Sequence, residues 1–157
     1  EAGILFQNKR IIEALEAIRE LNAIFEQDPQ IMNLRGACFV ELRDFPNATA
    51  EFQKSMAITG PNVNVLFNIG EVAFVSKNWQ ESLKFFTQTL ALTSDKATEM
   101  VAIIELKLML THISLAKDTN LSADERSAHE AKVLHFRKRL FVISWSRMRR
   151  STPLTNL

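Results

Sequence analysis

The stretch LFNIGEVAFVSKNW, residues 66–79, decides the fold, because a glycine stands among residues that otherwise favour a helix. A glycine inside a helix costs about 0.5 to 1 kcal/mol relative to alanine. Displacing the sequence by 34 residues places MNLRGACFVELRDF, residues 32–45, on this stretch, so that Gly36 coincides with Gly70. A glycine that recurs at the same phase indicates a repeated unit, in which close packing offsets the helix penalty.

The same 34-residue register continues on both sides of the two glycines. It aligns small residues with one another and bulky residues with one another: Ala14, Ala48 and Ser82; Ile18, Phe52 and Phe86; Phe45 and Trp79. Apolar residues recur at three- and four-residue spacing, so each unit is predicted to be two helices joined by a turn. Two helices approach closely where both carry small side chains. We therefore expect Gly36 to face Ala48, and Gly70 to face Ser82.

Polar residues and breakers divide the units. Asp44 precedes a helix that carries Pro46 in its first turn, where proline is tolerated. The dipeptides Asp28-Pro29 and Gly60-Pro61 are predicted to end the second helices of their units. These positions give units of about residues 1–29, 30–61 and 62–95.

This pattern resembles the tetratricopeptide repeat, which has a large residue, a leucine and a glycine on its first helix and an alanine and an aromatic on its second. The third unit matches with Leu66, Ile69, Gly70, Trp79, Ser82, Phe86 and Leu90, and the second with Met32, Gly36, Phe39, Phe45, Ala48, Phe52 and Pro61. Arg35 departs from the pattern, because it replaces the leucine. The resemblance implies an all-α fold, a right-handed α-solenoid of helix-turn-helix units that forms a single domain over residues 1–157.

The repeat fades toward the C-terminus. Ile104 stands where a third glycine is due, and residues 96–117 read as one long helix. Ser122 and Glu125 have the spacing of a capping box that opens a second long helix reaching toward Arg150. We interpret residues 96–150 as a degenerate fourth unit whose last helix caps the solenoid, and residues 151–157 as a frayed tail.

Composition and motifs give no sign of an enzyme. The chain has 46% hydrophobic and 24% charged residues and no long uncharged apolar run, so we expect a soluble protein without a transmembrane segment. It lacks metal-binding, nucleophile and phosphate-binding motifs, so we expect no catalytic residue, metal or cofactor. Cys38 is predicted to be a packing residue, and its presence leaves cytoplasm and periplasm open. The chain begins at Glu1, and we expect further sequence upstream.

In the tetratricopeptide family the first helices line a concave groove that holds a peptide or protein segment. Matching positions here, called the groove positions below, are Asn33, Ala37, Val40, Asn64, Phe67, Asn68, Glu71, Phe74, Val101 and Glu105. Some relatives hold a C-terminal carboxylate with basic residues, but here only Asn68 matches that clamp. The resemblance therefore favours an apolar or basic partner segment, anchored on Phe67 and Phe74. The alternative is that both rings are buried against the neighbouring unit.

The tail helix, residues 131–150, has a different charge from the rest of the chain. Residues 1–130 contain 12 basic and all 18 acidic residues, whereas residues 131–157 contain 7 basic and no acidic residue. Its apolar residues form two lines, Val133, Phe136, Leu140 and Ile143 in one and Leu134, Phe141, Trp145 and Met148 in the other. Besides capping, this helix is a candidate for self-association, for an anionic membrane or for nucleic acid. Its aromatics are not spaced for base stacking, so we do not expect it to read a nucleic-acid sequence.

The sequence thus favours a non-enzymatic scaffold that binds a peptide or protein. The alternative is a structural or assembly subunit, in which the basic amphipathic helix mediates self-association, giving a homo-oligomer, or contacts an anionic surface.

Overall fold

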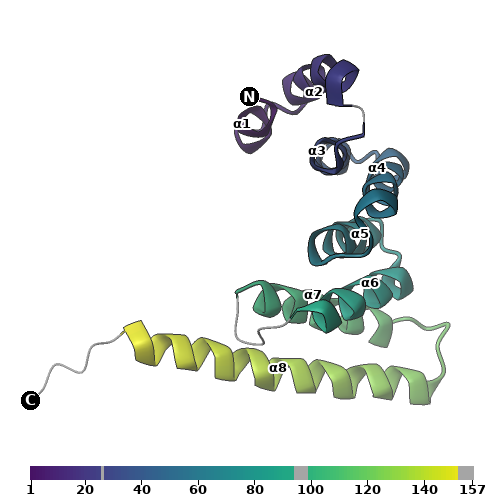
Figure 1. Cartoon of the computed structure of the whole chain (residues 1–157). Helices are drawn as coiled ribbons and strands as arrows, with labels where there is room; N and C mark the ends of the chain where they lie inside the picture. Colours follow the sequence, from purple (N-terminus) through teal and green to yellow (C-terminus); the bar gives the residue numbers. More distant parts are fainter. Residues whose placement is uncertain (26, 94–98, 152–157) are drawn as a thin grey trace, which may run out of the picture. The chain divides into compact units, whose positions relative to one another are not determined.

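The structure is a computed structural model that describes residues 1–25, 27–93 and 99–151, with side chains except those of 22–24 and 143–151. Every regular element in this part of the chain is a helix, which confirms the all-α class. The tail predicted to fray lies outside the described residues beyond Ser151. The helices are α1 (Ala2–Gln7), α2 (Ile11–Phe25), α3 (Pro29–Glu41), α4 (Phe45–Thr59), α5 (Val63–Val75), α6 (Trp79–Leu92), α7 (Glu99–Ala116) and α8 (Ala123–Ser151), as Figure 1 shows.

The helices form two compact units, one of α1–α5 within Glu1–Asn78 and one of α6–α8 within Trp79–Leu157. Their boundary falls inside the predicted repeat 62–95, between its two helices. The predicted single domain and the predicted contact of Gly70 with Ser82 concern both units, so they stay predictions. Within the first unit each helix packs against the next, and α3 also contacts α5. Within the second unit α6 packs on α7, and α7 packs on α8.

Three helix ends in the first unit share one turn geometry. Lys9, Arg43 and Lys77 have positive φ angles of 59°, 60° and 62°, and they stand 34 residues apart. At each turn the positive-φ amide donates to the carbonyl three residues back, at 3.0 to 3.1 Å, and the next amide donates to the carbonyl five residues back, at 2.8 to 2.9 Å. A left-handed residue after the last helical turn satisfies these carbonyls. The 34-residue period found in the sequence is therefore also a period of the backbone.

Gly36 lies where α3 meets α4. A Cβ atom at Gly36 would lie 2.6 Å from Cε1 of Phe52 and 2.9 Å from two other atoms of its ring. The atoms nearest to this Cβ position belong to the ring of Phe52. The predicted partner was Ala48. Ala48 lies one turn before Phe52 and is also buried. The close approach at Gly36 is thus confirmed, with an aromatic ring as its cause.

Residues that match at 34-residue steps are buried to the same extent. The small set Ala14, Ala48 and Ser82 is inaccessible to solvent, and the bulky set Ile18, Phe52 and Phe86 is almost completely so. Around Ala14 and Ile18, the side chains of α1, α2 and α3 form one apolar core that includes Cys38. The repeat register therefore predicts which side chains reach the core of each unit.

Two of the predicted helix ends are confirmed by side-chain hydrogen bonds. Asp44 caps α4 by accepting from the amide of Asn47 at 3.3 Å. Ser122 and Glu125 form the predicted capping box, because the amide of each one is bound by the side chain of the other, at 2.9 and 3.2 Å. Asp28 has a different role from the predicted one. Its side chain accepts from the amide of Gln30 at 2.7 Å, so Asp28-Pro29 begins α3, while α2 already ends at Phe25.

Candidate functional site: the faces of α3, α5 and α7

The groove positions of the first unit lie on two helices in contact. Asn33, Ala37 and Val40 share one face of α3, because residues four and seven apart are neighbours on a helix. The groove positions of α5 share a face for the same reason, and α3 contacts α5 directly. Asn64 is exposed and the remaining seven positions on α3 and α5 are half-buried. These side chains therefore keep part of their surface available to a partner.

Asn33 has an unusual environment for an amide. Its Oδ1 atom is shielded from solvent, and among the described residues it has no hydrogen-bond donor. A buried acceptor without a donor costs about 1 to 3 kcal/mol, so most such atoms in native proteins are paired.

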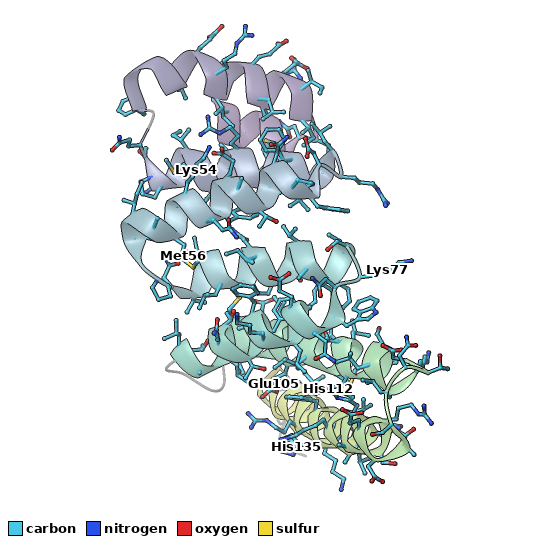
Figure 2. The ribbon with its side chains drawn as sticks, turned by 90° about the vertical axis from the view of Figure 1, so that its right-hand side faces the viewer. Lys54, Met56, Lys77, Glu105, His112 and His135 are labelled. Carbon is cyan, nitrogen blue, oxygen red and sulfur yellow. The ribbon has the colours of Figure 1, made fainter. Side chains whose placement is uncertain are left out.

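The two groove positions predicted on α7 occupy different surroundings. Val101 and Glu105 are 0% exposed, so in this structure neither presents surface to a partner. Helix α8 packs along α7 and brings Arg139 Nη2 to 2.7 Å from Glu105 Oε1. The sequence predicted a long capping helix, and α8 does pack on α7, but the groove register did not indicate that Glu105 lies beneath it. Figure 2 shows Glu105 and His112 at the contact of α7 with α8.

A second polar contact joins α7 to α8 two helical turns further along. His112 Nδ1 lies 2.8 Å from His129 Nδ1, and the ring of His112 stacks on Phe136 with centroids 6.0 Å apart. One imidazole donates and the other accepts, so this hydrogen bond requires that at least one ring be neutral. Burial, with the nearby His129 and Lys132, lowers the pKa of His112 to about 4, so it is neutral at pH 7.

An ion-pair network on α3 and α4 was not predicted from the sequence. The Arg35 guanidinium contacts Glu51 Oε2 at 2.7 Å, and Lys54 Nζ contacts Glu51 Oε1 at 2.8 Å. Beside them is a pocket of about 500 Å³, lined also by Met32 and Phe39. One sequence feature could have indicated this network: Arg35 stands where the repeat has a leucine. Ile69, the residue that corresponds to Arg35 in the next unit, is buried. The carboxylate of Glu51 and the two cations largely satisfy one another.

The two apolar lines predicted on the tail helix differ in their exposure to solvent. Phe136 is buried and Val133 and Leu140 are half-buried, so the first line belongs to the face docked on α7. Leu134 and Phe141, on the opposite side of α8, are 52% and 69% exposed. The remainder of both lines lies among the residues 143–151, whose side chains are not described.

Cys38 is buried in the core of the first unit, as predicted. Burial, assisted by the charge of Glu41, raises the pKa of its thiol to about 11. The reactive thiolate is therefore scarce at neutral pH.

No known protein family and no curated protein matches this sequence. Among the helices of the described residues, none is both long and apolar enough to cross a bilayer. Over the same residues no three His, Cys, Asp or Glu side chains are grouped as metal ligands would be.

Proposed function

We propose that the chain is a non-enzymatic interaction module of the tetratricopeptide type, a right-handed solenoid whose α3 and α5 faces bind a peptide or protein segment. The observation that carries this proposal is that Phe67 and Phe74, on one face of α5, and Asn33, on the adjoining α3, are each only half-buried and so keep surface for a partner. Side-chain amides that accept a partner's backbone N–H fix an extended peptide independently of its sequence. The 34-residue recurrence of the turns at Lys9, Arg43 and Lys77 supports the repeat assignment.

The groove positions also define the chemistry of the partner. On α3 and α5 they include two half-buried aromatic rings, Phe67 and Phe74, one carboxylate, Glu71, and no basic residue. Aromatic side chains supply much of the binding energy in interfaces, and a carboxylate disfavours an acidic segment. We therefore expect an apolar or basic segment rather than an acidic C-terminal tail.

Selection from a display library of short random peptides tests this function, because the library samples partner sequences of every composition. We expect the chain to enrich apolar and basic sequences, and Asn33→Leu and Phe74→Ala to abolish their binding. Ile58→Ala is the matched control, because this exposed residue of α4 is not a groove position. Thermal melting of each variant separates lost binding from lost folding. Enrichment that survives both groove substitutions, or peptides that bind equally to unfolded chain, would refute the groove.

A second candidate function is assembly through α8, favoured by the exposure of Leu134 and Phe141 on its outer side. In that case the chain sediments as an oligomer, and Leu134→Lys returns it to the monomer. A monomer over the whole accessible concentration range contradicts assembly and leaves the peptide-binding function untouched.

A further inference from the structure

The residues of α7 that face α8 correspond, in the 34-residue repeat, to the groove positions of α3 and α5. Stepping by 34 residues leads from Asn33 and Phe67 to Val101, and from Ala37 and Glu71 to Glu105. Both α7 residues, and Leu108 one turn beyond Glu105, are buried, whereas the corresponding residues on α3 and α5 are half-buried. Helix α8 packs along α7 and meets this face at Glu105 through Arg139.

We propose that this face of α7 is a binding site for a basic amphipathic helix, and that α8 occupies it in cis as an internal ligand. The inference rests on the proposed function, because the α7 residues of this site match groove positions in the 34-residue repeat. Its occupant has a definite chemistry. Phe136 stacks on His112, and Arg139, three residues later, reaches Glu105, so both contacts come from one face of α8.

The contact of α8 with Glu105 leaves the carboxylate incompletely satisfied. Glu105 is fully buried, yet Oε2 has no hydrogen-bond partner among the described residues. Arg139 Nη2 lies 2.7 Å from Oε1, and 41% of the Arg139 side chain is exposed. A buried charge without full pairing is unfavourable. A guanidinium that bridges both oxygens would bind this site better than Arg139 does.

The other described contacts of α8 with α7 combine a polar pair with an apolar line of which only Phe136 is buried, since Val133 and Leu140 are half-buried. One hydrogen bond between two histidines and one buried aromatic, Phe136, join it to the middle of α7. Its outer side is exposed at Leu134. Among the described residues the polar contacts between α8 and α7 are few, and a competing helix that carries an aromatic residue and an arginine three positions later could reproduce them.

A peptide of residues 123–151, labelled at its N-terminus, is the probe for this site. Fluorescence anisotropy compares its affinity for the wild-type chain with that for the variant Phe136→Ala/Arg139→Ala, whose own α8 is weakened. We expect the variant to bind the peptide roughly tenfold or more tightly than the wild type does. The same peptide with Arg139→Glu is expected to lose this binding, and the control peptide with Leu134→Ser to keep it. Equal affinity of both chains, or binding that is indifferent to Arg139→Glu, would overturn the proposal.

Hydrogen exchange on the wild-type chain gives a second measurement that does not depend on how the double variant folds. If α8 opens alone, its amides exchange faster than those of α7, and an excess of unlabelled peptide leaves α7 protected. Identical exchange rates along α7 and α8 would mean that they unfold together, and the site would not exist. Neither measurement involves α3 or α5. A negative result here would therefore reject the α7 site without rejecting peptide binding to α3 and α5, which the peptide selection tests.

Discussion

Gly36→Ala tests the packing that defines the repeat. The added Cβ would lie 2.6 Å from Phe52 Cε1 and 2.9 Å from Cδ1 and Cζ, well inside van der Waals contact. The ring of Phe52 is itself buried, so it cannot swing into solvent. Overpacking of this kind costs about 1 to 3 kcal/mol, while alanine gains up to about 1 kcal/mol in helix propensity. Taking a mid-range cost of about 2 kcal/mol and a gain of about 1 kcal/mol, we expect a net loss of about 1 kcal/mol in the free energy of unfolding.

Urea denaturation followed by circular dichroism measures this loss, with Gly3→Ala as the matched control. A Cβ at Gly3 meets nothing within 4 Å, so this substitution should leave stability unchanged or raise it. Phe52→Leu supplies the second half of a double-mutant cycle. Gly36→Ala should be less destabilising in the Phe52→Leu background, because the obstructing ring is gone. Gly36→Ala that is as stable as wild type, or strict additivity in the cycle, would refute the account of this crossing.

Three further outcomes follow from local geometry. Arg43→Gly should raise the free energy of unfolding by about 1 kcal/mol, because a left-handed backbone favours glycine; a lower melting temperature would contradict this. Ser122→Ala should lower it by about 1 kcal/mol through loss of the capping box, whereas the exposed control Ser127→Ala should not. His112 has an unfolded pKa of 6.5 and a folded pKa of about 4, so the unfolded chain binds the extra proton first and stability falls as pH drops through this window. The total loss is about 3 kcal/mol, and a His112→Gln variant with the same pH profile would show that another group is responsible.

Much of the fold could be predicted because its signals are local or periodic. Helix ends depend on residues three or four positions apart, as in the capping box of Ser122 and Glu125. Core positions follow from the 34-residue register, which places Ala14, Ala48 and Ser82 in buried surroundings. The role of Asp28 was predicted wrongly because Asp-Pro both ends one helix and begins another, and the preceding residues decide where α2 stops.

The candidate site was less accessible to sequence reasoning, because its environment depends on distant partners. The groove phase identified Val101 and Glu105 but gave no information on whether a further helix covers them. That coverage depends on Arg139 and Phe136 meeting α7 in one particular antiparallel register. The pairing of Arg35 with Glu51 was hidden for the same reason, since an arginine at an apolar position does not name its partner.

The central claim is that α3 and α5 present one peptide-binding face, and backbone amide shifts in NMR test it most directly. A peptide enriched by the library is titrated into the isotope-labelled chain. The account predicts that the largest shifts fall at Asn33, Phe67 and Phe74 and that the amide donor of the peptide is protected from exchange. Shifts that instead concentrate on the far surface of α4, around Ile58, or spread evenly over the chain would contradict it.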